Sequence, residues 1–436
     1  MSSKSAVRTA LLVFLVAASF GYGMVSEYLD IFPSNSIKEA YWVLYAKNKG
    51  NETDTTRSRT TVRTSLYRVS VDRINLPLHE SAEKGYGGID DLYSGALIAS
   101  NFGDLYYFDE TQTPHKLSVT VPFLRDEFDE IARSQDLTRD WFGVKDVLVR
   151  EESPPTFRVV VSNHHWNSEE KCYTLQFETA VLSREGPADF ALREAWDTIY
   201  ETHPCLPIKE EGNNFPGHQA GGSIQARSDT ELLLTIGDNE RDGVNGDKQV
   251  ITDSTTSYGK IIAVDLRTEE SSVFSTGHRN PQGLYIDPQG RIWSTEHGPE
   301  GGDELNLIEP GEHYGWPHVI YGTNYGAYRW PPSDTVGAHP GYRRPVFAWT
   351  PSIAVSELTG VEGDLFERWS GDLLISSLKR KTLYRTEIHD GRVIFTEPIE
   401  LGARLRDVVE LKDGTVLLKT DQGTLLALRP AEQSPA

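Results

Sequence analysis

The strongest constraint in this sequence is a pattern of short apolar runs separated by turn residues, which repeats from about residue 60 onward. The segment 407–430, DVVELKDGTVLLKTDQGTLLALRP, contains three such runs, with turns at 412–414 and 421–423. Runs of this length bounded by Gly, Asp and Pro are typical of strands that form hairpins. The sequence therefore predicts an all-β fold in which hairpins are the main connection.

The hairpins group into six units. These units lie near residues 60–115, 120–185, 217–268, 270–325, 345–392 and 404–430. The sixth unit is short, and a strand from near the N-terminus would complete its sheet. Six four-stranded antiparallel sheets in a radial arrangement form a six-bladed β-propeller, which protects sheet edges and leaves a central channel ringed by loops. A pair of β-sandwiches is the alternative, and it needs a linker near the middle of the chain, for which 203–217 is the candidate.

Helical segments are sparse in this sequence. EFDEIARSQ (127–135) and EAWDTIYETH (194–203) are each long enough for a few helical turns. We expect both to be excursions from the sheets.

The N-terminal 26 residues have the pattern of an export signal. Lys4 and Arg8 precede a run without charge from Thr9 to Ser26, as a positive region precedes an apolar one in signal peptides. A run of about 18 residues is at the lower limit for spanning a bilayer, so a cleaved signal and a retained membrane anchor both remain open. We divide the chain into a signal or anchor at 1–26, a linker at 27–59 and the propeller at 60–430, and expect it in the periplasm or at the cell surface.

Acidic residues outnumber basic ones by 64 to 43, which gives a formal net charge of −21. A surface of this charge repels phosphate backbones and anionic lipid heads. The composition therefore argues against a nucleic-acid-binding function.

Cys172 and Cys205 are the two cysteines of the chain. In an exported protein the leading expectation is a disulfide between them. Closing a loop of this length contributes about 3 to 4 kcal/mol to stability in the chain-entropy model. Two buried thiols are the alternative, and neither cysteine has the spacing of a zinc ligand.

Residues 296–304, EHGPEGGDE, combine four carboxylates with three glycines. Glycines allow backbone carbonyls to turn toward a hard cation and the acids add negative potential, a combination that suits Ca²⁺. The spacing departs from the EF-hand pattern. Taken alone, the segment is better explained as a solvated acidic turn.

Three longer motifs resemble the signature of a known family. They are GHRNPQGL (277–284), EHGPEGGDELNL (296–307) and HYGWP (313–317). Their sequences and order are similar to those of the soluble glucose and sorbosone dehydrogenases that depend on pyrroloquinoline quinone (PQQ), and the similarity runs from about residue 217 to 420. Members are exported six-bladed propellers that oxidise sugars with PQQ and Ca²⁺, so the resemblance implies this fold, activity and cofactor set.

The resemblance also implies the catalytic groups. His218 in GHQAGG matches the base that takes the hydroxyl proton while a hydride leaves the sugar carbon for the quinone, a task that suits imidazole with its pKa of about 6.5. Asp238 in TIGDN matches the carboxylate that orients this histidine and stabilises its cationic form. Arg279 matches a residue near the quinone oxygens that stabilises developing negative charge. Taken alone, a single histidine is more often a satisfied hydrogen-bonding residue.

PQQ is a tricarboxylate, so an acidic protein must build a local basic site for it. Lys379 in SSLKRKTLYR and Arg404 and Arg406 in GARLRDVV match the family's cations, and alternation along a strand places the two arginines on one side. The resemblance implies further cofactor contacts from Gln219, Arg279, Asn280, Gln282 and Trp349. An exposed basic rim is the alternative explanation of the cations.

The resemblance assigns calcium to the acidic, glycine-rich loop. The carbonyl oxygens of Gly298 and Pro299 match the pair that holds the ion, which polarises the quinone carbonyl as a Lewis acid. Asp303 matches an acidic position of the same loop. All three residues are therefore predicted to belong to the metal site.

The sequence indicates less about the substrate and the electron acceptor. Gly217 precedes the predicted base where the glucose enzyme carries an acid, and residues 50–210 show no specific resemblance. We expect a sugar, an aldose or a related polyol, and name no electron acceptor. Two other functions stay open from the residues: a non-catalytic propeller that binds a glycan or a protein, and a calcium-dependent lactone hydrolase, against which the cluster of Lys379, Arg404 and Arg406 argues.

Overall fold

The fold is seen in a computed structural model of the chain. It describes residues 57–77, 86–137, 141–210, 213–214, 217, 219–243, 250–323 and 338–431. The predicted signal or anchor (1–26), the predicted linker up to residue 56 and the predicted base His218 lie outside these residues. Among the described residues, no helix is both long and apolar enough to cross a bilayer.

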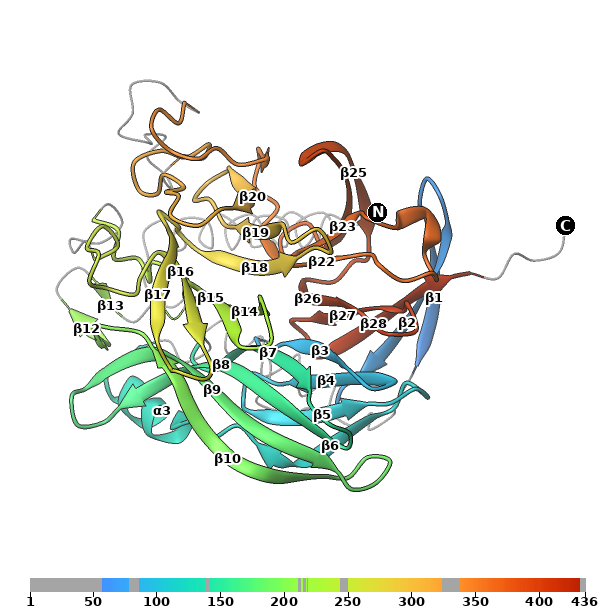
Figure 1. The fold of residues 1–436 in the computed structure, drawn as a ribbon, viewed down its shortest axis with the longest axis horizontal. Helices are drawn as coiled ribbons and strands as arrows, with labels where there is room; N and C mark the ends of the chain where they lie inside the picture. The colour runs from blue at the N-terminus through green and yellow to red at the C-terminus, as the bar shows by residue number, and fades with distance from the viewer. Residues whose placement is uncertain are drawn as a thin grey trace, which may run out of the picture. The chain divides into compact units, whose positions relative to one another are not determined.

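Six antiparallel sheets follow one another around a common axis (Figure 1). Blade one consists of β3 (Ile89–Leu92), β4 (Gly95–Ala99), β5 (Asp104–Phe108) and β6 (Pro114–Thr120). Blade two consists of β7 (Val144–Glu151), β8 (Thr156–Asn167), β9 (Cys172–Arg184) and β10 (Phe190–Glu201). Blade three consists of β14 (Gly221–Ala226), β15 (Glu231–Ile236), β16 (Lys260–Asp265) and β17 (Ser271–Thr276).

The remaining sheets complete the circle. Blade four consists of β18 (Pro281–Ile286), β19 (Ile292–Glu296), β20 (Asp303–Ile308) and β21 (Phe347–Trp349). Blade five consists of β22 (Val355–Gly360), β23 (Leu373–Ser377), β24 (Thr382–His389) and β25 (Arg392–Glu400). Blade six, from the outside inward, consists of β1 (Ser58–Arg63), β2 (Arg68–Asn75), β28 (Thr424–Pro430), β27 (Val416–Thr420) and β26 (Leu405–Glu410). This arrangement confirms the predicted six-bladed β-propeller.

Blade six is closed by strands from both ends of the described chain. β2 pairs with β28 in antiparallel register from Val69 opposite Pro430 to Asn75 opposite Thr424. The prediction that an N-terminal strand completes the last sheet is confirmed, and β1 adds a second one. Consequently residues 58–75 belong to blade six, and their assignment to the first predicted unit was wrong.

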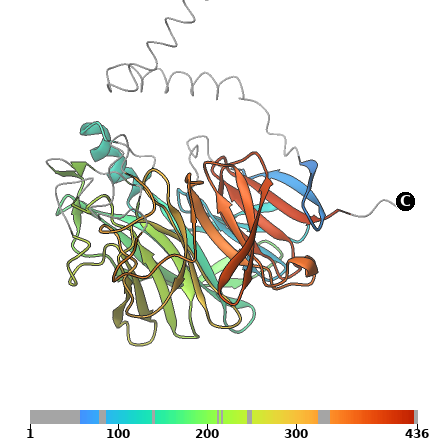
Figure 2. The same ribbon diagram turned by 90° about the horizontal axis from the view of Figure 1, so that it is seen from above.

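Within the described residues, few elements lie outside the blades (Figure 2). α3 (Arg125–Ser134) confirms the helix predicted near 127–135. The prediction of a helix at 194–203 is wrong, because this segment pairs with the free edge of β9 and forms most of β10. Short pieces complete the list: β11 (Leu206–Pro207), β12 (Lys209–Glu210), β13 (Asn213–Asn214) and the 3₁₀ turn η1 (Glu367–Trp369).

A separate apolar cluster fills each of the six interfaces between neighbouring blades. The cluster between blades two and three, for example, contains Phe177 and Leu234, and that between blades five and six contains Leu374 and Leu418. Residues that alternate along a strand point to opposite faces of its sheet. Each blade can therefore bury one face against the preceding blade and the other against the following one.

Near the axis, polar side chains hydrogen-bond each blade to the next. Asp407 Oδ2 accepts the Ile89 N–H at 2.6 Å, between blades six and one. Asp90 Oδ2 accepts the Val149 N–H at 2.6 Å, between blades one and two. Around the rest of the circle the bonds are Ile224 N to Asp146 Oδ2 (2.9 Å), Gly221 N to Asn280 Oδ1 (3.2 Å), Leu284 N to Glu357 Oε1 (2.9 Å) and Ser356 Oγ to Leu405 O (2.7 Å).

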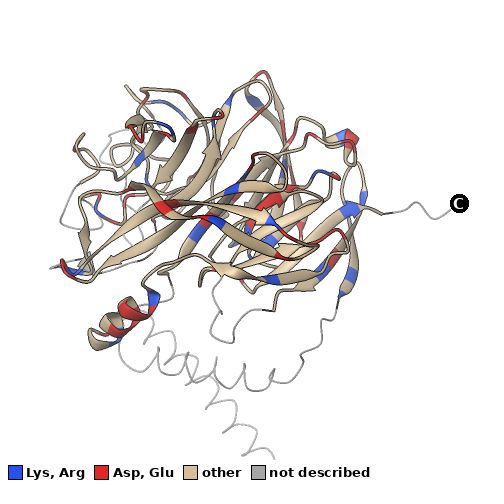
Figure 3. Ribbon diagram, turned by 60° about the horizontal axis from the view of Figure 1, so that its bottom comes forward, with Lys and Arg blue, Asp and Glu red and all other residues tan. Residues whose placement is uncertain are grey.

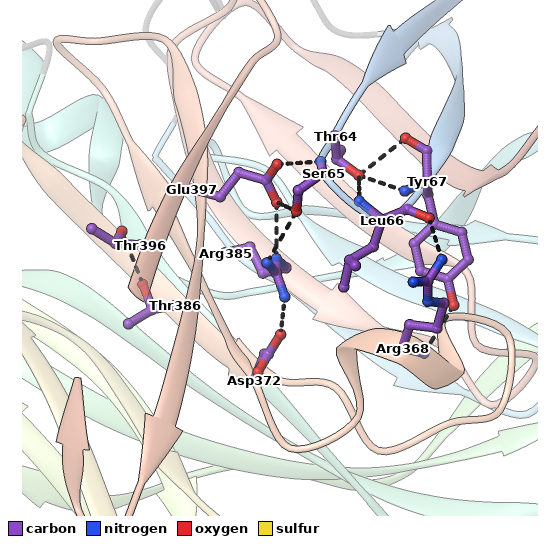
Figure 4. Close-up of polar contacts among 10 residues, drawn as sticks. All are labelled: Thr64, Ser65, Leu66, Tyr67, Arg368, Asp372, Arg385, Thr386, Thr396 and Glu397. Atoms are coloured by element: carbon purple, nitrogen blue, oxygen red, sulfur yellow. Dashed lines mark hydrogen bonds and ion pairs between the residues drawn. The ribbon is translucent and has the colours of Figure 1, made fainter. Parts of the chain in front are cut away.

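The turn between β1 and β2 is held against blade five by a buried ion-pair network (Figure 4). Arg385, whose side chain is 4% exposed, donates to Asp372 Oδ2 at 2.6 Å and to Glu397 Oε2 at 3.0 Å. Glu397 in turn accepts hydrogen bonds from the N–H and the hydroxyl of Ser65 in the turn. The network thus links β24, β25 and the residue before β23 to the hairpin that closes blade six.

Replacement of Arg385 tests the importance of this network. Arg385→Met leaves the buried Asp372 and the partly buried Glu397 without their cation, and removing one partner of a buried pair costs about 3–5 kcal/mol. We expect a loss of this size in the free energy of unfolding measured by denaturant titration. The control is Arg429→Met, because the Arg429–Asp413 pair is about half exposed and is expected to contribute less than about 1 kcal/mol. Equal losses in both variants would contradict the interpretation.

Candidate active site

The innermost strands surround a small cavity on the propeller axis. Its lining residues are Tyr86, Gly87, Lys145, Asp146, Gly221, Gly222, Ser223, Gln282, Ser356, Glu357, Arg406 and Asp407. Figure 3 shows basic and acidic positions interleaved along the strands in the middle of the propeller. Gln282 and Arg406 had been predicted from the sequence as cofactor contacts, and the cavity brings them together. Lys145 and Asp146 were not predicted to belong to the site. A charged pair inside the apolar strand VKDVLV is nevertheless a sequence signal that could have identified them.

The predicted arginine pair converges on one carboxylate. Arg404 Nε lies 2.7 Å from Asp421 Oδ2, and Arg406 Nε lies 2.8 Å from Asp421 Oδ1. Burial alone would raise the pKa of Asp421, but the two guanidinium groups outweigh this effect and hold it below its usual value. The two arginines therefore point to one side, as alternation predicts, and Arg406 is the more buried of the two.

Arg279 is buried beside the loop predicted to hold calcium. Its Nη1 donates to the carbonyl oxygens of His297 at 3.3 Å and Gly298 at 3.2 Å. Its backbone N–H donates to Glu296, whose other carboxylate oxygen lies 2.9 Å from His278 Nδ1. Within the part of the chain that the structure describes, Arg279 Nε has no hydrogen-bond partner. The guanidinium group is therefore fixed in place with one donor still available.

Asp238 is completely buried next to Arg279. Its Oδ2 accepts a hydrogen bond from Trp316 Nε1 at 2.8 Å and its Oδ1 accepts one from the Glu240 N–H at 2.9 Å. Its backbone N–H donates to the carbonyl oxygen of Arg279 at 2.8 Å. Burial, and then the charge of Asp242, raise the pKa of Asp238 well above its usual value, while the charge of Arg279 opposes this shift.

The residue after the predicted base packs against the loop that carries Asp238. The Asn239 N–H donates to the Gln219 carbonyl oxygen at 3.0 Å. Gly237 is required at this contact, because a Cβ there would lie 2.0 Å from the same oxygen. Gln219 and Asn239 both have positive φ, 58° and 50°, which is uncommon for residues other than glycine and often occurs at functional sites. The role of His218 itself stays a prediction.

Asp303 holds the calcium-loop candidate in place. Its Oδ1 accepts the Gly298 N–H at 3.1 Å, and its Oδ2 accepts the N–H groups of Ile353 at 2.9 Å and Ala354 at 2.6 Å. A carboxylate engaged in this way has little capacity left for a metal ion. The structure therefore favours a positioning role for Asp303, and the carbonyl oxygens of Gly298 and Pro299 stay the candidate ligands.

The other predicted cofactor residues have different surroundings. Asn280 Oδ1 accepts hydrogen bonds from the Gly221 N–H and from Gln282 Nε2, so these side chains join blades three and four at the cavity. Lys379 is exposed in the loop after β23. Trp349 is 7% exposed and belongs to the apolar cluster between blades four and five. It does not line the cavity, so the structure lends no support to its predicted contact with the cofactor.

A comparison with known protein families decides the family. A family model described as Glucose / Sorbosone dehydrogenase matches residues 142–427. The chain belongs to this family. The matched segment spans blades two to five and most of blade six, and it includes every candidate site residue named above except Tyr86 and Gly87.

Two curated relatives are similar to this chain over about half its length. An aldose sugar dehydrogenase of Escherichia coli (strain K12) is 30% identical over 243 residues, which cover 52% of this chain and 62% of that protein. An uncharacterized protein of Synechocystis is 36% identical over 243 residues, 51% of this chain and 58% of that protein. The chain thus matches about three-fifths of the length of these two relatives.

Solved structures share the fold over a longer stretch. The PQQ-bound form of an aldose sugar dehydrogenase from Streptomyces coelicolor has a TM-score of 0.57 and 19% sequence identity, and the match covers 86% of this chain and 99% of that one. At this identity the likeness establishes the propeller alone.

Glu357, which lines the cavity, makes the stability of the folded protein depend on pH. Its Oε1 accepts the N–H groups of Leu284 and Leu358, so a proton on Oε2 disturbs neither bond. Burial, and then the charges of Asp146 and Asp407, raise the pKa of Glu357 well above its usual value of 4.5. The folded protein therefore keeps a proton that the unfolded chain releases, and this stabilisation is lost as pH rises through the raised pKa.

The variant Glu357→Gln tests this linkage. It keeps the acceptor oxygen and cannot ionise, so we expect its melting temperature to fall less than that of the unchanged protein as pH rises above about 5. Thermal unfolding followed by circular dichroism across a pH series measures the difference. Parallel curves for the two proteins would show that Glu357 does not hold the extra proton.

Asp303→Asn tests the positioning role of that carboxylate. The amide cannot accept hydrogen bonds at both ends, and bonds to a charged group contribute about 1.5–3 kcal/mol. We expect a loss of that size in the free energy of unfolding. Asp390→Asn is the control, because its side chain is 89% exposed. A loss no larger than that of the control would rule out the role.

Proposed function

We propose that this protein is an exported quinoprotein that oxidises an aldose or a related polyol with PQQ and Ca²⁺. Membership of the glucose/sorbosone dehydrogenase family supports the reaction class, as does the similarity to an aldose sugar dehydrogenase. The PQQ in the Streptomyces coelicolor structure supports the choice of cofactor. The single observation that carries the proposal is a buried group of arginines in a strongly acidic protein: Arg406 lines the axial cavity and shares Asp421 with Arg404, and the charges of Arg279 and Arg406 both act on His297.

The residues present fit an anionic, oxygen-rich group. Arg279 is 3% exposed and keeps a buried Nε donor with no partner among the described residues. Arg406 lines the cavity and is 8% exposed. Buried guanidinium groups favour bidentate pairing with carboxylates and stabilise negative charge on oxygen.

When bound, PQQ supplies a quinone that accepts a hydride, and Ca²⁺ polarises its carbonyl as a Lewis acid. The carbonyl oxygens of Gly298 and Pro299 would hold the ion, in a turn that Asp303 fixes. Arg279 Nη1 donates to the Gly298 carbonyl oxygen, so it would share that oxygen with the ion or release it, and it would stabilise negative charge that develops on quinone oxygen.

His218 would take the proton of the sugar hydroxyl on its imidazole. Asp238 follows a strand whose loop hydrogen-bonds Gln219, the residue after His218, and this supports the role of Asp238 as the group that would orient the histidine. Burial raises the pKa of Asp238 and so disfavours its charged form, whereas a positive charge on His218 would favour it, so the carboxylate and the imidazolium would stabilise each other. The substrate is a small-molecule sugar, and the N-terminal segment would carry the chain to the periplasm or cell surface, with or without membrane attachment.

Reconstitution tests the proposal. Purified protein mixed with PQQ and CaCl₂ is expected to reduce a redox dye only when an aldose or polyol from a substrate panel is added. His218→Asn should lower kcat by about 10²- to 10⁴-fold, the usual contribution of a general base, and should leave PQQ binding intact. The exposed His389→Ala serves as the control. Absence of both PQQ binding and sugar-dependent reduction in the unchanged protein would overturn the proposal and favour a non-catalytic binding propeller.

A further inference from the structure

Arg241 is a buried arginine that the proposed function does not use. It belongs to the loop after β15, is 1% exposed and is not among the residues that line the axial cavity. Its Nη1 donates to the hydroxyl oxygen of Tyr173 at 3.0 Å and to the carbonyl oxygen of Asn239 at 3.3 Å. Its Nη2 donates to the carbonyl oxygen of Pro207 at 3.1 Å. One guanidinium group thus joins three segments of the chain.

Two of these three segments are fixed to each other. Tyr173 lies in β9, and the short strand β11 pairs with β9, with Pro207 opposite Cys172. The disulfide between Cys172 and Cys205, predicted from the sequence, is present and joins the residue before β11 to the first residue of β9. Two of the acceptors of Arg241 are therefore held together by strand pairing and by a covalent bond.

The third segment is the loop that carries Asp238, and its backbone has an uncommon conformation. Asn239 and Glu240 both have positive φ, 50° and 61°. Residues other than glycine keep this conformation only where their surroundings hold them in it. Arg241 contributes twice, because its N–H donates to the Asp238 carbonyl oxygen at 3.0 Å and its guanidinium group donates to the Asn239 carbonyl oxygen.

The same loop binds the residue after the proposed base. The Asn239 N–H donates to the Gln219 carbonyl oxygen at 3.0 Å, and Gln219 Nε2 donates to Glu240 Oε1 at 3.0 Å. The position of Asp238 relative to Gln219 therefore depends on the conformation of this loop. A change in that conformation would alter the geometry of proton transfer without removing a group that takes part in it.

We propose that Arg241 is a positioning residue for sugar oxidation, which fixes the loop 237–241 against β9 and β11 so that Asp238 can orient the proposed base. The inference rests on the proposed function. Arg241 acts through Asp238 and touches neither the substrate nor the cofactor. Lysine is a poor replacement, because an ammonium group on a flexible stem does not reproduce the planar donor geometry of a guanidinium group.

Steady-state kinetics of the full chain reconstituted with PQQ and Ca²⁺ test the inference. Arg241→Lys keeps the positive charge and removes the bridging geometry. We expect kcat to fall by about 10- to 100-fold, because small displacements of catalytic groups have effects of this size. The KM for the sugar and the affinity for PQQ should stay unchanged, since no binding group is removed.

Arg385→Lys is the matched control. Arg385 is also a buried arginine with several acceptors, and it binds Asp372 and Glu397 in blade five. Its replacement should lower stability and leave kcat unchanged. An equal fall of kcat in both variants would contradict the inference.

A double-mutant cycle distinguishes positioning from a general structural role. Asp238→Asn should itself lower kcat, and the effects of residues that act as a unit are not additive. Arg241→Lys should therefore have little further effect on kcat in the Asp238→Asn background. The same fold-loss in both backgrounds would overturn the inference.

Hydrogen exchange gives a readout that does not need turnover. In the cofactor-free protein, mass spectrometry of peptides that cover 237–241 should show faster exchange of the backbone amides in Arg241→Lys than in the unchanged protein. Arg385→Lys should exchange at the unchanged rate in this loop. Equal exchange in Arg241→Lys and the unchanged protein would show that Arg241 does not hold the loop.

The outcomes separate this inference from the function on which it rests. If the unchanged protein oxidises a sugar and Arg241→Lys does so with the same kcat, the inference is wrong and the proposed function stands. If the unchanged protein neither binds PQQ nor oxidises a sugar, both are wrong. Should Arg241→Lys fail to fold, Tyr173→Phe decides, because it removes one acceptor of Arg241. A lower kcat that is absent in the Asp238→Asn background supports the inference, and an unchanged kcat contradicts it.

Discussion

The structure depends on closing a circle of six sheets with polar bonds at its centre. Apolar clusters fill the space between blades, but near the axis the innermost strands approach one another with backbone N–H and C=O groups that need partners. Asp, Glu, Asn and Ser side chains supply those partners at all six interfaces. The position of every loop at the cavity follows from this ring of bonds.

These hydrogen bonds between blades also explain why charged groups accumulate near the propeller axis, where burial excludes most water. Carboxylates that bridge blades must stand near the axis, and burial raises the pKa of Asp146 and Glu357 there. Lys145, Arg406 and Lys419 share the space, held by carbonyl oxygens, by Asp421 and by the Tyr86 ring. Charges so close together interact strongly because the surrounding dielectric is low. The charged residues at the centre of this propeller therefore hold the blades together and also set the local electrostatic potential.

The sequence predicted the propeller and, among the residues that line the cavity, Gln282 and Arg406. Apolar runs and turns identified the hairpins, and alternation placed Arg404 and Arg406 on one side. The strand β10 was missed because its pairing with β9 overrides the local helical preference of 194–203. The contact between Tyr86 and Lys145 was missed because it joins separate parts of the chain, and no local pattern encodes such a contact. Trp349 resembled a family position, but the packing of blade four against blade five decides where its ring lies.

The pairing of β2 with β28 has a consequence for how the chain is made. A ribosome delivers β2 early and β28 last, so the first strand must wait with an exposed edge while about 350 residues are synthesised. Unpaired edges invite association with other chains. Until β28 pairs with it, β2 keeps an exposed edge through which a newly made chain can associate with others.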